Sequence, residues 1–443
     1  MPGTEETAQA YPSPRYAWWV AGVLAVAYMV GYIDRQALSL MTDMVKADLG
    51  VSDSYMGWLN GSFGLFYAVA GMPIAYLADN KSRRAIITTG IFCWTLACAA
   101  CGLAQTYWQL FAARIGVGVG ESTLLPCTHS LLGDYFPPAK LPRALSVFQV
   151  GGLAGSGLAF FVVGTVLSIV EGAEPLELPV FGPLRPWQET FLYVALPGFA
   201  MMALMLTVKE PLRRMMRGGQ SGGATTREVL GFYKANWVTL TCHHLGFASM
   251  SIVAFGVIGW MAPFFGRTYG VAPSTFGQVY GLYQIFFGSL GIMSVAFLAE
   301  YLARKGKRDA NILAAVYTSA AVIPICILTP TMPTATWAWI SLIPNTLLVG
   351  SVFGLAHGAL PVITPPNMRA RVGAFYTFFY TVVGTLLGFG FTGMLTDYLF
   401  TSPEDLRYSI MVMAGFFGPI GLGLLLLARK PYARSLEAAE AWH

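Results

Sequence analysis

Long apolar stretches alternate with short polar ones along nearly the whole chain. A helix needs about 20 residues to cross a hydrocarbon core of roughly 30 Å. Twelve stretches suit that length, at about 17–42, 55–78, 85–105, 107–133, 142–169, 189–208, 236–266, 275–299, 310–330, 335–362, 371–396 and 406–428. A β-barrel would show alternating segments of about ten residues instead, and the sequence lacks that period. We therefore predict an all-α polytopic membrane protein with 12 transmembrane helices.

Composition excludes the soluble classes of protein. Hydrophobic residues make up 55% of the 443 residues and charged residues only 11%, whereas soluble domains carry about 25% charge. A single soluble core stops growing at roughly 250–300 residues, so the apolar surplus has no soluble core to enter. Six cysteines in a chain of this length are too few for a disulfide scaffold.

The placement of positive charge predicts the topology. The two tails and the loops after spans 2, 4, 6, 8 and 10 hold 21 Lys and Arg residues, and the opposite loops hold 4. Cytoplasmic loops carry the excess of Lys and Arg, so we expect both termini in the cytoplasm and the protein in the cell (inner) membrane. The basic central loop is then a topology signal and no nucleic-acid site. The N-terminal flank, with Glu5 and Glu6, does not resemble a signal peptide.

The sequence divides into two similar halves. The long basic linker at 209–235 separates six spans from six, which predicts two pseudo-symmetric six-helix bundles at 17–208 and 236–428, between cytoplasmic tails at 1–16 and 429–443. The span end Tyr76–Asp79 recurs as Phe297–Glu300 at an offset of 221 residues. Lys209–Pro211 recurs as Arg429–Pro431 at an offset of 220. Parallel repeats of this kind place a binding site between the halves near mid-membrane.

Four ionisable residues fall inside predicted spans, all in the first half: Asp34, Arg35, Arg114 and Glu121. Each charge at that depth costs roughly 2.5–3.5 kcal/mol, and such residues usually pair and mark a pathway. From the helical rise, we expect Asp34 and Arg114 at the same depth in the membrane. Arg35 and Glu121 should differ in depth by no more than the length of one long side chain. We expect Glu121, and after it Asp34, to carry a coupling proton, and the two arginines to pair with them or with an anionic substrate. A static pair that fixes spans 1 and 4 is the alternative.

The stretch Ala75–Arg84 resembles the loop signature between spans 2 and 3 of the major facilitator superfamily. Arg114 is similar to that superfamily's span-4 arginine, and Gly151–Gly157 to its span-5 glycine motif. The resemblance implies the major facilitator fold and alternating access. It also implies a cytoplasmic gate, here made of Asp79, Arg83, Arg84, Asp134 and Arg371. Topology signals without a gating role are the alternative for these charges.

A narrower resemblance is to the spinster subfamily. It rests on Tyr32–Arg35, Gly118–Ser122, Asp134–Pro138, Arg143–Leu145, Trp187 with Phe191, and Pro365–Ala370. The resemblance implies proton-linked movement of sphingoid or lysolipid molecules. Aromatic rows in spans 8 and 11, including Tyr280 and Phe375, suit the tail of such an amphiphile.

Other candidate chemistry is sparse. His243 and His244 are candidates for a proton relay, although a hydrogen-bonding role inside the span is the simpler interpretation. Cys98 and Cys101 form a CxxC without a nearby acid or His and are interpreted as small core residues. We find no catalytic or metal-binding motif and no phosphate-binding P-loop, and expect no cofactor apart from the coupling proton.

Three functions compete. The favoured one is a monomeric, proton-coupled secondary transporter whose partners are a small amphiphilic substrate and membrane lipids. The second is a proton-driven multidrug or small-solute exporter of the same superfamily, and the third is a membrane enzyme or channel. An exporter of cations would favour unpaired acids, whereas two acids and two arginines balance here.

Overall fold

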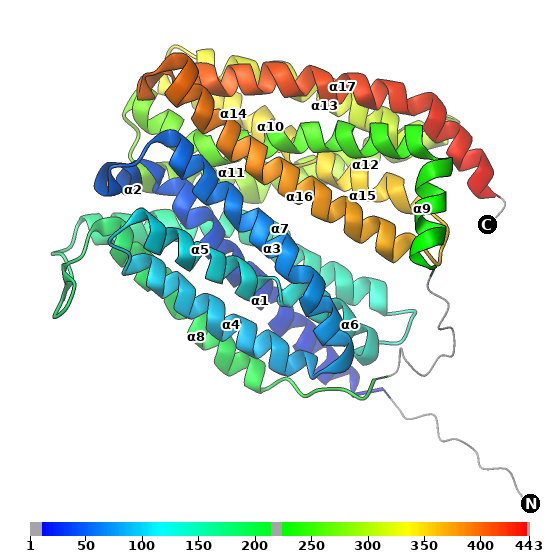
Figure 1. The fold of residues 1–443 in the computed structure, drawn as a ribbon, viewed down its shortest axis with the longest axis horizontal. Coiled ribbons are helices and arrows are strands. Elements are labelled where there is room, and N and C mark those ends of the chain that lie inside the picture. The colour runs from blue at the N-terminus through cyan, green and yellow to red at the C-terminus, as the bar shows by residue number, and fades with distance from the viewer. Residues whose placement is uncertain (1–10, 214–223, 441–443) are drawn as a thin grey trace, which may run out of the picture.

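The computed structural model describes residues 11–213 and 224–440. Parts of the predicted tails and linker, at 1–10, 214–223 and 441–443, lie outside the described residues. The described chain forms two bundles of long helices that lie side by side (Figure 1). The predicted all-α membrane fold is confirmed, since eleven helices are long and apolar enough to cross a membrane among the residues that the structure describes.

The N-terminal bundle is built from α1 to α8. Its elements are α1 (Pro14–Leu40), α2 (Thr42–Leu49), α3 (Asp53–Asn80), α4 (Arg83–Gly102), α5 (Tyr107–Glu121), α6 (Leu124–Tyr135), α7 (Leu141–Glu171), the hairpin strands β1 (Glu177–Leu178) and β2 (Gly182–Pro183), and α8 (Pro186–Leu206). The two strands pair antiparallel.

The C-terminal bundle follows a short helix in the linker. Its elements are α9 (Thr226–Ala235), α10 (Trp237–Tyr269), α11 (Pro273–Tyr283), η1 (Gln284–Gly288), α12 (Ser289–Arg304), α13 (Ala310–Leu328), η2 (Thr329–Thr331), α14 (Ala335–Val349), α15 (Val352–Ile363), α16 (Arg369–Met394), η3 (Leu395–Phe400), η4 (Pro403–Asp405) and α17 (Leu406–Ala439). The linker is thus partly helical. The helix α17 also continues eleven residues past 428, through most of the predicted tail.

The predicted fourth span is not one helix but two, α5 and α6, which meet at Ser122 and Thr123. The Ser122 hydroxyl donates to the Val119 carbonyl at 2.7 Å, and the Thr123 hydroxyl to the Gly120 carbonyl at 2.8 Å. Such bonds compete with the helical ladder. Pro126 has no N–H to donate to the Ser122 carbonyl, which also weakens the ladder. The break places Glu121 at the last position of α5.

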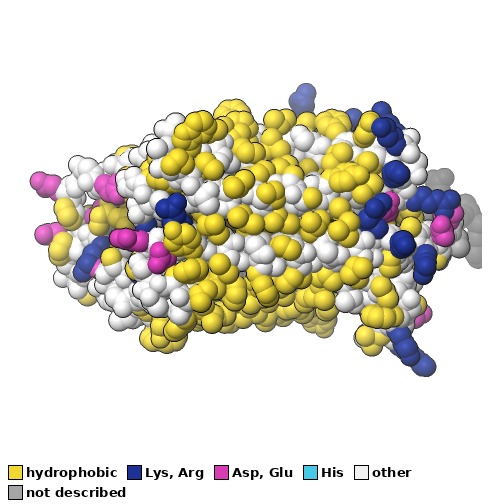
Figure 2. All heavy atoms as spheres, turned by 90° about the horizontal axis from the view of Figure 1, so that it is seen from above, with side chains coloured by type: hydrophobic (Ala, Val, Ile, Leu, Met, Phe, Trp, Pro, Cys, Tyr) yellow, Lys and Arg dark blue, Asp and Glu magenta, His cyan; other side chains and the backbone are white. Residues whose placement is uncertain are grey.

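The two ends of the molecule differ in charge. Figure 2 shows Lys and Arg side chains gathered at one end and an apolar belt along the middle of the face in view. The start of α1 and the end of α17 lie at that same end (Figure 1). We call it the basic end and the other the distal end. An apolar belt between two charged ends is what a membrane-spanning protein presents to lipid.

The bundles touch mainly in their distal halves, where α3 packs on α16 and α7 on α11. A Cβ added at Gly61 would lie 3.0 Å from the Leu386 Cα, and one at Gly281 2.6 Å from the Phe161 amide nitrogen. Nearer the basic end the bundles separate, and Tyr76 of α3 is 71% exposed and Phe375 of α16 52% exposed. The molecule is therefore closed at the distal end and open at the basic end.

Candidate functional site

The four predicted charges lie together between α1 and α5. Asp34, Arg114 and Glu121 are 3%, 1% and 2% exposed, so all three are buried. Asp34 and Arg35 are neighbours in α1. Arg114 and Glu121 are both in α5, where they lie two turns apart on the same face of the helix. Small residues let α5 pack closely on its neighbours, since Gly118 lies against α3 and Gly120 against α4.

Arg35 and Glu121 form a direct ion pair. The Arg35 Nε donates to Glu121 Oε2 at 2.5 Å, and the Arg35 side chain keeps a fifth of its surface exposed while Glu121 is buried. The other carboxylate oxygen, Oε1, has no hydrogen-bond partner among the described residues. The charge of Glu121 thus depends on this arginine.

Aromatic rings surround the Arg35 guanidinium. Its Cζ lies 4.8 Å from the ring centres of both Tyr32 and Tyr67, and 5.2 Å from that of Phe63. The negative faces of such rings attract a cation. Sequence reasoning placed the aromatic lining in the other half and missed these rings. A signal existed, since Tyr32 is one turn before Arg35, and Phe63 and Tyr67 lie one turn apart.

Asp34 and Arg114 are neighbours, but not as a charge pair. The Arg114 Nη1 donates at 2.8 Å to the main-chain carbonyl of Asp34. The Asp34 carboxylate accepts from the Cys98 thiol at 3.0 Å instead. Both sulfur and carboxylate are buried. Cys98 is therefore more than a small core residue, because it touches a candidate proton carrier.

The two histidines lie in the other bundle. His243 Nε2 is 3.2 Å from the Ala356 carbonyl and His244 Nε2 is 3.1 Å from the Tyr233 hydroxyl. Their rings pack against Tyr376 of α16. The structure thus gives both histidines local partners within the C-terminal bundle, and leaves their predicted relay role a prediction.

At the basic end, Arg83 holds the N-terminal bundle together. It bonds Asp134 of α6, and its Nε donates to Glu210 at 2.8 Å. The Glu210 carboxylate also accepts from the Arg84 amide at 2.8 Å. Burial alone would raise the pKa of Glu210, but these hydrogen bonds outweigh it, so its pKa lies below the usual value. Sequence reasoning missed Glu210 because it follows the last span as an ordinary polar residue.

The remaining predicted gate residues lie apart. Arg213 donates to the main-chain carbonyl of Asp79. Arg371 is exposed in the first turn of α16. Hydrogen bonds from Thr225, and then the charge of Arg371, lower the pKa of Glu228 in α9. The predicted gate stays a prediction, because the pairing it invokes belongs to a state that is closed at the basic end.

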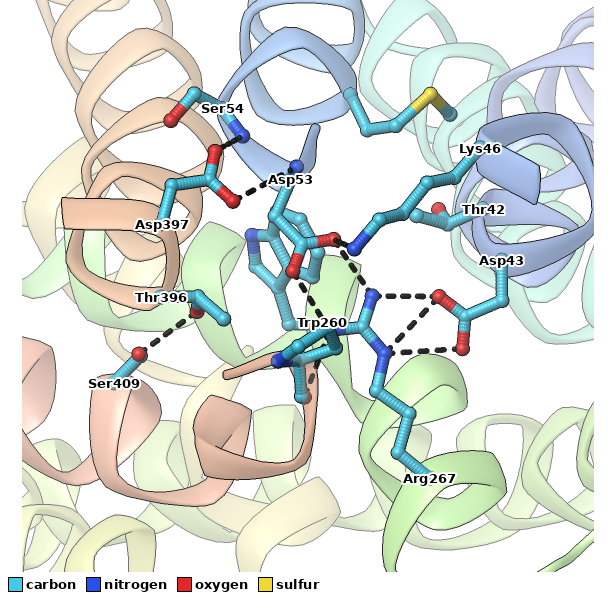
Figure 3. A network of polar contacts seen from close by, with 12 residues as sticks. Thr42, Asp43, Lys46, Asp53, Ser54, Trp260, Arg267, Thr396, Asp397 and Ser409 are labelled. Atoms are coloured by element: carbon cyan, nitrogen blue, oxygen red, sulfur yellow. Dashed lines mark hydrogen bonds and ion pairs between the residues drawn. The ribbon is translucent and has the colours of Figure 1, made fainter. Parts of the chain in front are cut away.

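At the distal end, ion pairs join the two bundles. Arg267 at the end of α10 donates to Asp43 of α2 at 2.6 Å and to Asp53 of α3 at 2.7 Å (Figure 3). Lys46 adds a bond to Asp53 at 2.8 Å. Asp53 is fully buried. In the sequence, Lys46 and Arg267 are two of the four positive charges of the opposite loops, and nothing there pairs them with Asp43 or Asp53. In the structure these four residues join the bundles at the distal end.

Two helical bundles around buried charges, closed at one end and open at the other, define an alternating-access membrane transporter rather than an enzyme. The model of the Major Facilitator Superfamily matches residues 24–389, so the chain belongs to this superfamily.

Similar proteins refine this assignment. The chain is 24% identical to an "MFS-type efflux pump" of Mycolicibacterium smegmatis, over 96% of this chain and 95% of that one. It is 23% identical to "Sphingosine-1-phosphate transporter SPNS2" of Xenopus tropicalis, over 98% and 87%. A crystal structure of "A Bacterial Homolog to Human Lysosomal Transporter, Spinster" in an inward-facing, unoccupied conformation has a TM-score of 0.76 at 22% identity, over 97% and 99%. The predicted spinster-like resemblance is confirmed.

Proposed function

We propose that this transporter couples protons to the movement of an amphiphilic, lipid-like anion, such as a sphingoid phosphate or lysolipid. The observation that carries the proposal is the Arg35–Glu121 ion pair, in which a partly accessible arginine is the described partner of a buried carboxylate. Arg35 is exposed enough to bind a substrate directly, whereas the buried Glu121 is affected by a substrate only through the loss of its ion pair with Arg35.

The coupling follows from the cost of burying charge. An anionic headgroup that binds the Arg35 guanidinium competes with Glu121 for it. A buried carboxylate that loses its cation is strongly unfavourable, and taking up a proton removes that cost. Substrate binding and protonation of Glu121 therefore favour one another. Asp34, whose described donor is the weak thiol of Cys98, is a second proton carrier.

The substrate class follows from what surrounds the arginine. A phosphate or carboxylate matches the forked donors of Arg35 or Arg114, while rings such as Tyr67 and the exposed Phe375 offer apolar surface to a tail. A similar protein is named for a sphingosine phosphate, which joins an anionic head to an apolar chain.

We place both termini in the cytoplasm and the protein in the cell membrane. The 21 Lys and Arg residues on the side of the termini support this orientation. The basic end is then cytoplasmic, and the conformation described above is inward-facing.

Purified protein in liposomes under an imposed pH gradient tests the proposal. Lysolipids and sphingoid phosphates should be taken up with the gradient and drug cations should not. Glu121→Gln should abolish the dependence on pH and keep substrate binding. The control is Glu189→Gln, which changes a buried acid at the distal end of α8. Unaltered pH dependence in Glu121→Gln would refute the coupling.

The second candidate is a proton-driven exporter of drugs or small organic solutes. It is favoured by the likeness to an efflux pump over nearly the full length of both chains. The same liposomes distinguish the two, because movement of cations alone would exclude an anionic amphiphile.

A further inference from the structure

Asp397 lies in η3, the wide helical turn that follows α16, and its side chain crosses to the other bundle. The carboxylate accepts from the Asp53 amide at 3.2 Å and from the Ser54 amide at 2.6 Å (Figure 3). These amides begin α3, and the first N–H groups of a helix have no acceptor inside it. The residue at the N-cap position, Ser52, makes no side-chain capping bond. The C-terminal bundle therefore caps a helix of the N-terminal bundle.

The Asp397 carboxylate bonds main-chain amides, whereas Asp43 and Asp53 form ion pairs with cationic side chains. The cations in the loops of the distal end bond other groups among the described contacts. Arg267 and Lys46 bond Asp43 and Asp53, Arg185 bonds Asp48, and Arg407 bonds the Pro330 carbonyl. The charge of Asp397 is met by the start of α3 instead, where free N–H groups and the helix dipole favour an anion. A bond from an amide to a carboxylate is stronger than one between neutral groups.

The position of Asp397 is fixed by its own bundle. Thr396 donates to Ser409 of α17 at 2.8 Å. Gly393 lets the start of α3 approach, because a Cβ there would lie 2.8 Å from the Asp53 carbonyl carbon. Asp397 thus moves with the C-terminal bundle, while the amides that it caps move with the N-terminal one.

We propose that Asp397 is a gating residue of the transport cycle, a helix cap that forms only while the distal end is closed. Opening that end withdraws the carboxylate and leaves two amides of α3 to water. The proposal rests on alternating access and not on the proposed proton or substrate, so either can fail without the other.

The test is a distance measurement across the distal end. Spin labels at Trp108→Cys in α5 and Trp337→Cys in α14, both exposed positions, in a Cys93→Ser background, report the distance by pulsed electron resonance in nanodiscs. Asp397→Ala should raise the ratio of distally open to distally closed molecules about five- to tenfold, as loss of a charged cap predicts. Asp397→Asn keeps one acceptor and the side-chain volume, so it should fold and shift the ratio less.

Two further measurements distinguish the loss of the Asp397 helix cap from the loss of any negative charge at the distal end. Glu404→Ala removes an exposed acid of η4 at the same end and should leave the ratio unchanged. Hydrogen–deuterium exchange in a peptide that contains Asp53 and Ser54 should quicken in Asp397→Ala and not in Glu404→Ala. An unchanged ratio with unchanged exchange in Asp397→Ala, or an equal shift in the control, would overturn the proposal.

Discussion

At the scale of single residues, Arg35 is held by two kinds of partner at once. Glu121 supplies charge and the rings of Tyr32, Phe63 and Tyr67 supply polarisable faces. A guanidinium serves both, because it is planar and more weakly hydrated than an ammonium. Either kind of partner alone would leave the arginine less firmly placed.

The ion pair should be revealed by a mutant cycle. Arg35→Met leaves Glu121 buried without a cation and should lower the free energy of unfolding by about 3 kcal/mol. Adding Glu121→Gln to Arg35→Met removes the stranded charge and should restore most of that loss. Thermal unfolding in detergent measures both. Arg185→Met, at an exposed arginine that pairs with Asp48, is the control and should change little. If the effects of Arg35→Met and Glu121→Gln on the free energy of unfolding simply added, the two side chains would not be energetically coupled.

The sequence made the four buried charges visible because charge inside a span is rare and costly. It paired Arg35 with Glu121 in depth, but it also paired Asp34 with Arg114, and there the arginine reaches the main-chain carbonyl. Helical rise gives the level of a residue in the membrane, whereas the direction of its side chain depends on how helices are rotated. Contacts from a third helix, such as that of Cys98 with Asp34, were therefore beyond prediction.

At the scale of elements, span positions follow from hydropathy, but their interruptions do not. The break between α5 and α6 depends on two hydroxyl bonds and on Pro126, which barely change the mean hydropathy of the stretch. The π-helical turns η1 and η3 also leave the mean hydropathy of their spans almost unchanged, so hydropathy does not reveal them. These interruptions matter for function, since one holds Glu121 and another holds Asp397.

Glu210, whose carboxylate bonds the start of α4, should make the stability of the protein depend on pH. The pKa of Glu210 is lowered in the folded protein, so its contribution to stability is complete above its ordinary value of 4.5 and is lost as pH falls below that. Glu210→Gln should cost about 0.5–1 kcal/mol at pH 7, a modest amount because the side chain is partly exposed. Unfolding curves at pH 7 and pH 4 should differ less in this variant than in the parent. A cost that is equal at both values would contradict the assignment.

At the scale of the whole molecule, the repeat and the linker predict two bundles, whereas no sequence pattern selects a conformation. One sequence must encode both states of a rocking transporter, and their free energies differ by only a few kcal/mol. The state described here is favoured by contacts at the distal end, where glycines let α3 approach α16 and α7 approach α11. These contacts are steric, so they can be tested apart from the charges.

Gly61→Val should disfavour the distally closed state. A side chain at Gly61 would meet the Leu386 Cα at 3.0 Å and the Thr385 carbonyl oxygen at 3.1 Å, both of them backbone atoms that cannot turn aside. Overpacking of this kind costs about 1–3 kcal/mol, and the bundles can avoid the cost by separating at that end. We therefore expect fewer distally closed molecules and slower transport, because a state that cannot close cannot complete the cycle.

The matched control is Gly423→Val in α17, where an added Cβ has no atom within 4 Å. It makes the same change in a helix away from the contacts between the bundles, and should alter neither transport nor the distance between labels at 108 and 337. If Gly61→Val left that distance unchanged in folded protein, close packing of α3 on α16 would not be what holds the distal end shut. The ion pairs of Arg267 and the Asp397 cap would then have to hold it alone.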